Sequence, residues 1–232
     1  MPKFPGRLVS IGLGVESTPG TTVAPTHWMR HMSADFQRKT TTIQNESAMG
    51  RYERVNDSAV VETWAEGSLE GKVYDLSIGP LLYNIFGSLV TSDNADSNAA
   101  VKDHTFDVAQ SIAAKTLTVT RVDPISTRRH GTATLESLEF TAEAGGWVMV
   151  NGALHALPGT TASDVAAYAA ENSFTSKHVS VKLASNVAGL SGASNISIKS
   201  LRLTLSREAH QELSAWLDRA GIHRCRRYRR RG

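Results

Sequence analysis

Two residue pairs have the types and spacing from which metal binding or acid–base catalysis could arise. His27 and His31 are four residues apart, a spacing that suits two imidazole ligands on one face of a helix. The surrounding residues favour a strand, where this spacing separates two side chains by about 13 Å at about 3.3 Å per residue, too far for one ion. Asp103 and His104 are adjacent, and neighbours on a strand point to opposite faces, so they do not form a catalytic dyad.

Two further segments approach a nucleotide-binding or calcium-binding loop without completing it. Gly12-x-Gly14 lacks the third glycine of a dinucleotide-binding turn and indicates a glycine-rich strand or bend. Residues 93–96, Asp-Asn-Ala-Asp, lack the ligand spacing, the glycine and the terminal glutamate of a calcium loop. The sequence also has no nucleophile elbow, phosphate-binding loop or His-Glu-x-x-His motif. It therefore predicts no catalytic residue, no cofactor and no metal, and we expect a protein that is not an enzyme.

The C-terminal segment 224–232 carries the strongest local charge in the sequence. Its basic residues are Arg224, Arg226, Arg227, Arg229, Arg230 and Arg231, with no acidic residue among them. Without these six of the 25 basic residues, 19 face 22 acidic ones, so the rest of the chain has a net charge of −3. Three interpretations stay open: the tail binds phosphates, it is a solubilising end, or it results from a late change of reading frame.

The composition is typical of a soluble globular protein rich in strands. Of 232 residues, 41% are hydrophobic and 20% charged, with 18 glycines. The single cysteine, Cys225, excludes an intrachain disulfide. The first residues lack the apolar core of a signal peptide, and no run reaches the roughly 20 apolar residues of a membrane helix. We therefore expect a soluble protein without a membrane anchor, made in the cytoplasm.

Alternation of apolar and polar residues predicts most of the fold. Strand patterns cover residues 26–31, 59–74, 117–120, 179–183 and 196–205. Residues 135–157 predict a hairpin that turns at Gly145-Gly146, because glycine supplies the positive φ that tight turns need. These patterns favour a mainly β fold of the sandwich or barrel-like type.

Three segments depart from the strand pattern. Residues 33–56 are largely polar, and connections of that length are uncommon in compact domains, so they predict an extended loop or arm. Pro80 fits the first position of a short packing helix. Residues 206–223 predict a C-terminal helix, followed by a tail at 224–232 that we expect to be disordered. Residues 1–205 would then form the β domain.

Several segments between residues 7 and 155 occur in an order shared with one protein family. They are Gly12-x-Gly14-x-Glu16-x-Thr18-x-Gly20-Thr21, Ala24-Pro25-Thr26-His27-Trp28, Ile43-Gln44-Asn45-Glu46-Ser47 with Gly50, Glu66–Asp75, Gly79–Gly87, Asp103-His104-Thr105-Phe106 and Leu135–Glu143. Together they resemble the tail tube (major tail) proteins of long non-contractile-tailed phages. The sequence departs from that family after Leu205, where further β structure is expected and a helical pattern begins.

The resemblance implies a structural virion protein whose β-sandwich protomers form hexameric rings stacked into a tail tube. DNA would pass through the lumen without sequence-specific binding, and tape-measure and tail-terminator proteins would be partners, with assembly in the bacterial host cytoplasm. The 33–56 arm would reach a neighbouring subunit or ring. Its candidate assembly residues are Gln44, Glu46, Ser47, Gly50 and Arg51. The alternative is a β-sandwich binding module that uses its C-terminal arginines on nucleic acid.

Overall fold

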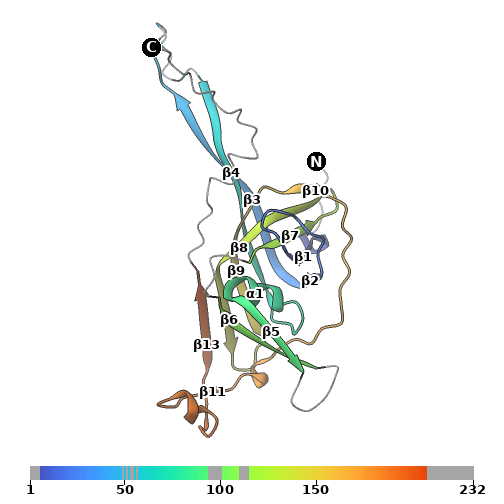
Figure 1. The fold of residues 1–232 in the computed structure, drawn as a ribbon, viewed down its shortest axis with the longest axis vertical. Helices are drawn as coiled ribbons and strands as arrows, with labels where there is room; N and C mark the ends of the chain where they lie inside the picture. Colours follow the sequence, from blue (N-terminus) through green and yellow to red (C-terminus); the bar gives the residue numbers. More distant parts are fainter. Residues whose placement is uncertain are drawn as a thin grey trace, which may run out of the picture.

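One large antiparallel sheet forms the body of the structure. The computed structural model describes residues 6–48, 50, 52, 55, 57–93, 101–109 and 115–207. Among these residues, nine strands form a sheet in the order β2-β1-β7-β8-β9-β4-β3, with β10 and β13 each paired to β8 (Figure 1). The nine strands are β1 (Ser10–Val15), β2 (His27–Met29), β3 (His31–Asn45), β4 (Asp57–Lys72), β7 (Leu117–Val122), β8 (Thr127–Glu143), β9 (Val148–Ala156), β10 (Thr160–Ala162) and β13 (Ser200–Ser206).

The sheet folds into two layers because β8 belongs to both. The first half of β8 pairs with β7 and β10, and its second half pairs with β9 and β13. The register shifts between Leu135 and Ser137, and a bulge of this kind bends and twists a strand. We call β2, β1, β7, the first half of β8 and β10 the short sheet. We call β13, the second half of β8, β9, β4 and β3 the long sheet.

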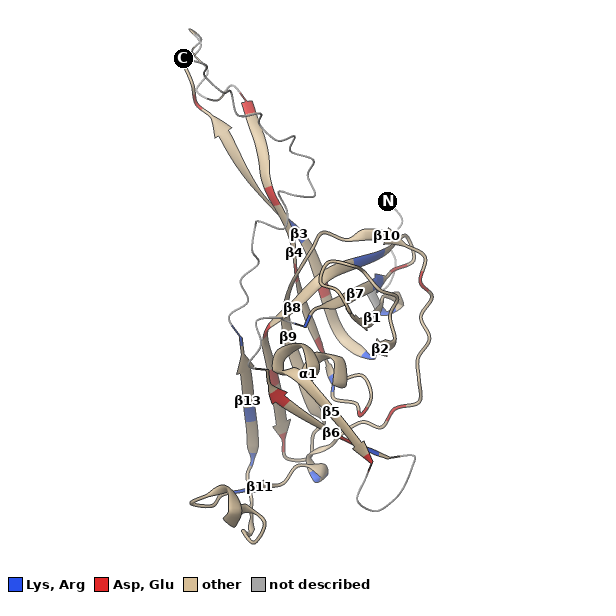
Figure 2. Ribbon diagram, viewed as in Figure 1, with Lys and Arg blue, Asp and Glu red and all other residues tan. Residues whose placement is uncertain are grey.

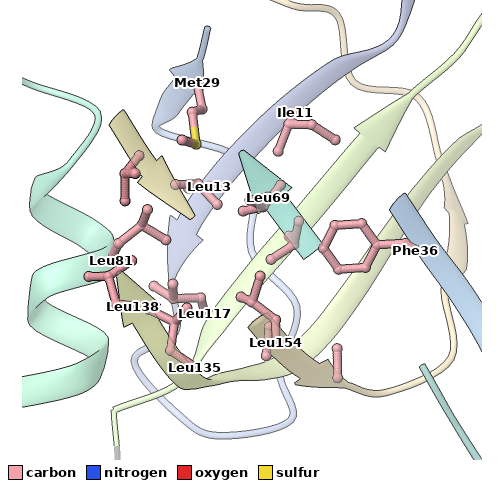
Figure 3. Packing of buried hydrophobic residues seen from close by; sticks show 14 of the residues in the cluster. Ile11, Leu13, Met29, Phe36, Leu69, Leu81, Leu117, Leu135, Leu138 and Leu154 are labelled. Carbon is pink, nitrogen blue, oxygen red and sulfur yellow. The ribbon is translucent and has the colours of Figure 1, made fainter. Parts of the chain in front are cut away.

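The core lies between the two layers and is closed at one end by a helix. Figure 3 shows side chains from both sheets meeting there, among them Leu13 and Leu117 of the short sheet and Leu69 and Leu154 of the long sheet. These leucines are at most 1% exposed. Helix α1 (Gly79–Phe86) buries Leu81 against this cluster. The predicted sandwich-like class and the short packing helix at Pro80 are confirmed.

Two buried polar side chains fix the places where the sheet changes pairing. Asn84 of α1 is fully buried; its Nδ2 donates to the carbonyls of Lys115 and Ala133, at 2.6 and 3.2 Å, and its Oδ1 accepts from the Leu135 amide at 2.8 Å. It thereby pairs backbone groups next to the point where β8 leaves β7 and reaches its bulge. Because buried backbone groups are costly when unpaired, Asn84 holds α1 at this bend.

Glu16 has a similar role at the same end of β7, beside the turn that follows β1. Its carboxylate accepts hydrogen bonds from the hydroxyls of Thr116 and Thr118, at 2.7 and 2.8 Å, and from the amides of Gly20 and Thr132, at 3.0 and 2.9 Å. Thr132 has a positive φ of 52°, a conformation that is uncommon outside glycine. The four bonds join the turn after β1 to β7 and β8, which explains why a carboxylate is buried here.

The smaller elements lie outside the main sheet. Strands β5 (Gly87–Asp93) and β6 (Lys102–Val108) pair only with each other, as do β11 (Val181–Lys182) and β12 (Asn195–Ile196). Three short 3-10 helices are η1 (Gly6–Leu8), η2 (Ser176–His178) and η3 (Val187–Leu190). The segment 179–183, predicted as a strand, is a strand only over β11, because it pairs with a two-residue partner instead of the main sheet.

Other predicted boundaries shift for local reasons. The hairpin at 135–157 is present with β8 extended back to Thr127, but only Gly145 of its glycine pair has a positive φ, 82°. Most of the stretch predicted as an extended loop or arm, 33–56, is strand β3, because its polar and threonine-rich residues pair with β4. Ser206, the first residue of the predicted helix at 206–223, is the last residue of β13, and Arg207 follows it. The rest of that predicted helix lies outside the described residues.

Candidate assembly surfaces

The long sheet has two free edges, one on each side. β13 pairs with β8 and β3 pairs with β4, and no other described strand pairs with either of them. An unpaired edge presents a row of backbone donors and acceptors to another chain. The corresponding edges of the short sheet, β2 and β10, are only three residues each. The long sheet therefore offers the more extensive edges for assembly.

The register of β13 identifies which backbone groups are available for assembly. The Ala144 amide donates to the Lys199 carbonyl, and the Arg207 amide donates to the Glu136 carbonyl. In an antiparallel pair the bonded positions alternate, so residues 201, 203 and 205 also direct their backbone groups toward β8. The residues between them, Arg202 and Thr204 among others, direct theirs outward. These outward groups form the free edge.

The arm is a two-stranded ribbon that continues the long sheet beyond the body of the molecule. β4 pairs with β9 only from Ala65 to Lys72, so residues 57–64 of β4 pair only with β3 (Figure 1). A bulge between Thr41 and Thr42 interrupts the ribbon. Three apolar side chains on this ribbon are more than half exposed: Ile43, Val60 and Val61. Such a ribbon has little apolar surface to bury on itself, and a two-stranded ribbon alone is at best marginally stable in water.

Four of the five predicted assembly-loop residues are described, and they lie at the outer end of this arm. Gln44 is in β3 opposite Ser58, and Glu46 and Ser47 follow directly after the strand. The Ser47 amide donates to Asn45 Oδ1 at 3.1 Å. Gly50 has a φ of 71° and open space around its Cα, and Arg51 is not among the described residues. Their role in assembly stays a prediction.

The outer face of the long sheet is polar and acidic. Outside the arm residues 40–63, the register places six carboxylates there, against three permanently charged bases, so this part of the face has a net charge of −3 with histidine neutral. The acids are Asp35, Glu66, Glu70, Glu136, Glu139 and Glu143, and the bases are Lys39, Lys72 and Arg202. Small polar residues occupy most of the remaining positions on this face. Figure 2 shows acidic positions along β8 and the arm side of β4.

Ion pairs neutralise only part of this acidic face. Glu136 lies 3.0 Å from His155 Nε2, Glu139 pairs with Arg202, and Glu66 lies 3.6 Å from Lys39. The hydrogen bond from Trp64 lowers the pKa of Glu66; burial acts in the opposite direction, and Lys39 and His155 lower it further. Glu66 is therefore ionised at neutral pH. The face remains negative overall.

The residue pairs with possible chemistry are not assembled into a site. His27 Nδ1 lies 2.9 Å from Thr26 Oγ1, and His104 Nδ1 lies 2.9 Å from Thr91 Oγ1. Among the described residues there is no group of three or more His, Cys, Asp and Glu that could hold a metal, and no helix long and apolar enough to cross a membrane. Gly12 and Gly14 lie in β1, where added Cβ atoms would come within 2.5 Å of Pro25 and 2.8 Å of Ala24. These two glycines permit close packing of β1 against the segment that contains Ala24 and Pro25.

The basic tail at 224–232 lies outside the described part of the chain.

The sequence patterns locate β13 but do not reveal its edge. Leu201, Leu203 and Leu205 alternate as expected of a strand, with Arg202 and Thr204 between them. The free edge depends on which strand pairs with β8, and that pairing joins residues more than 55 positions apart. The 135–157 hairpin, in contrast, lies in the middle of the long sheet, where β8 and β9 are already paired on both sides.

Comparison with protein families gives a match over nearly the whole chain. Residues 6–228 match the family model described as phage tail tube protein. No curated protein matches the chain.

Proposed function

The chain belongs to the phage tail tube protein family, and from this premise we propose that six copies join edge to edge into a ring and that stacked rings conduct DNA. Membership makes the protein a structural component of the virion tail that assembles with other tail components into a tube. The hexameric ring, the DNA conduit and the long non-contractile tail are the proposed details. The observation that supports a ring is the pair of free edges on opposite sides of the long sheet, β13 and β3.

Ring closure would pair β13 of one copy with β3 of the next. Each of the four internal strand pairs of the long sheet is antiparallel, so β13 and β3 run in the same direction. Rotation about a ring axis preserves the direction of strands along that axis. The joint between subunits would therefore be parallel, while every pair within a subunit is antiparallel. An isologous dimer of two β13 edges would instead leave β3 unpaired and could not close a ring.

The acidic outer face of the long sheet would line the lumen. Its net charge of −3 per copy outside the arm disfavours binding of DNA phosphates, which basic walls would retain. In a barrel of this kind the strands are tilted by about 35–45° from the axis, so the arm that continues β3 and β4 would leave the ring obliquely and extend toward an adjacent ring. We propose the tape-measure protein as the occupant of the lumen during assembly and the tail-terminator protein as the partner at the tube end. Assembly would take place in the host cytoplasm.

A proline at Thr204 tests the edge without disturbing the protomer. The Thr204 amide points away from β8, so T204P removes one outward donor and adds bulk at the edge while the β8 ladder is kept. T204V is the matched control because it keeps the amide. We expect T204V to form rings or tubes in negative-stain images, and T204P to stay monomeric by light scattering with unchanged circular dichroism.

Two outcomes would contradict the proposal. One is a wild-type protein that remains monomeric at high concentration. The other is a T204P variant that forms the same rings as T204V, because the β13 edge would then not be in the joint between subunits.

A further inference from the structure

A small lobe lies at the end of the molecule opposite the arm. We define the base lobe as residues 177–199, which contain β11, η3 and β12 and lead directly into β13. Figure 1 shows the arm at one end of the long axis and the base lobe at the other. The pairs Val181–Ile196 and Lys182–Asn195 are its only ladder among the described residues. A two-stranded unit of this size is at best marginally stable without a covering surface.

The base lobe exposes apolar side chains that its own chain does not cover. Val187 is 86% exposed and Leu183 is 73% exposed, and Leu190, Ile196 and Ile198 are each more than a third exposed. Five exposed apolar side chains within one small lobe favour an interaction surface, because such side chains gather at sites where proteins bind partners.

A groove runs between the base lobe and the turn that joins β8 to β9. Its apolar lining includes Ala142, Val179, Ile196 and Ile198. Lys177 and Lys199 line it as well, with Glu143 as the one acidic residue. The groove is therefore lined by apolar side chains together with more bases than acids, which fits a ligand that combines apolar and acidic side chains.

The arm of a second copy has this composition. Among the described residues of 40–63 there are three acids, Glu46, Asp57 and Glu62, and no base. The base lobe contains Lys177, Lys182 and Lys199 and no acid. The arm also exposes Ile43, Val60 and Val61. Figure 2 shows acidic positions on the arm and none in the lobe.

We propose that the base lobe of one copy is the receptor for the arm of another copy in the adjacent ring. The inference rests on the proposed function, and it adds the identity of the surface on which the arm docks. The two surfaces are different and lie at opposite ends, so the contact is heterologous and repeats without closing. Such a contact propagates along one axis, as stacking of rings into a tube requires. The ring joint between β13 and β3 is a separate contact.

Charge reversal with rescue tests the pairing of the two surfaces. K177E/K199E reverses the charge of the two lysines that line the groove, and D57K/E62K reverses the charge of two carboxylates on the arm. We expect each variant alone to form rings but to raise the critical concentration for tube growth by about tenfold or more, since like charges then face each other. The combined four-residue variant restores opposite charges and should return tube growth to within about threefold of wild type.

A second pair of variants tests the apolar contact. V187E places a charge on the exposed apolar surface of the lobe, and V165E is its matched control, because Val165 is 82% exposed and lies in the segment that connects β10 to η2. Both should fold normally, as circular dichroism would check. V187E should give rings without tubes, and V165E should give tubes of wild-type length.

The outcomes separate this inference from the proposed function. If wild type forms no rings, the proposed function is wrong. If wild type forms tubes and K177E/K199E and V187E form the same tubes, the lobe is not the receptor while the ring and tube stand. Loss of tubes in the combined variant would also overturn the pairing of arm and lobe.

Discussion

Replacement of Asn84 by leucine tests whether one buried amide holds the bend of β8. Leucine is branched at the same atom as asparagine and has a larger volume, so N84L leaves no cavity, but it removes both donors and the acceptor of the side chain and crowds the site. The Lys115 carbonyl, the Ala133 carbonyl and the Leu135 amide then lose their partner.

The cost follows from the burial of those three backbone groups. Lys115 is partly exposed, so its carbonyl can bind water instead. The bonds to Ala133 and Leu135 are buried, and each buried group left unpaired costs about 1–3 kcal/mol. We therefore expect N84L to lower the free energy of unfolding by about 2–6 kcal/mol, a large part of the roughly 5–15 kcal/mol of a typical domain.

Urea unfolding followed by tryptophan fluorescence measures this loss, because the chain has four tryptophans. The experiment is done at a concentration where the protein is monomeric, so that assembly does not add to the apparent stability. N151L is the control, since Asn151 is exposed on the outer face of the long sheet and should change stability by less than about 0.5 kcal/mol. A loss below about 1 kcal/mol for N84L would refute the account of the bend, because one unpaired buried group alone costs that much.

The remaining predictions concern protonation, close packing and the buried carboxylate. Burial lowers the pKa of His130 and His31 from 6.5; a backbone hydrogen bond opposes the shift in each, and nearby arginine lowers the pKa further. Their contribution to stability is therefore complete above pH 6.5 and falls as the pH drops below it, so the urea midpoint should decrease from pH 7.5 to 5.0, and less so in H130F. G12A, whose Cβ would lie 2.5 Å from Pro25, should destabilise by about 1–3 kcal/mol, whereas G79A, with open space, should change the thermal midpoint little. E16Q should lower the free energy of unfolding by about 2–4 kcal/mol, measured in urea, because an amide nitrogen would face two of the four donors that now bind the carboxylate. An unchanged free energy of unfolding would show that those two donors bind water instead.

The local part of the fold could be predicted because it depends on residues close in sequence. Pro80 and the apolar residues after it are enough to indicate α1, and Gly145-Gly146 between two alternating segments is enough to indicate the β8–β9 hairpin. The strand within residues 33–56 could not be predicted, because a strand without a buried face has no alternation of apolar and polar residues. β3 shows this, since Phe36 is its one buried residue.

The surfaces proposed for assembly depend on contacts that no local pattern contains. β13 pairs with the part of β8 that lies beyond its bend, and its outer edge is free because no other described strand pairs with it. Asn84, which binds next to that bend, is 51 residues from its partner Leu135. The apolar residues of 179–183 and 196–198 have the alternation of a strand, but they lie in the base lobe and are exposed. Whether an apolar residue faces a core or a neighbouring copy is decided by the topology, and the topology is set by long-range pairs.

The passage of β8 through both layers also has a mechanical meaning. A load applied to the long sheet reaches β8 through its ladders to β9 and β13, and the backbone of β8 carries it into β7 and on to β1. That path consists of covalent bonds and hydrogen-bonded ladders throughout, so it does not depend on slip-prone side-chain packing between the layers. The two layers of each protomer therefore deform as one body, and a wall built from such bodies resists shear between its inner and outer surfaces.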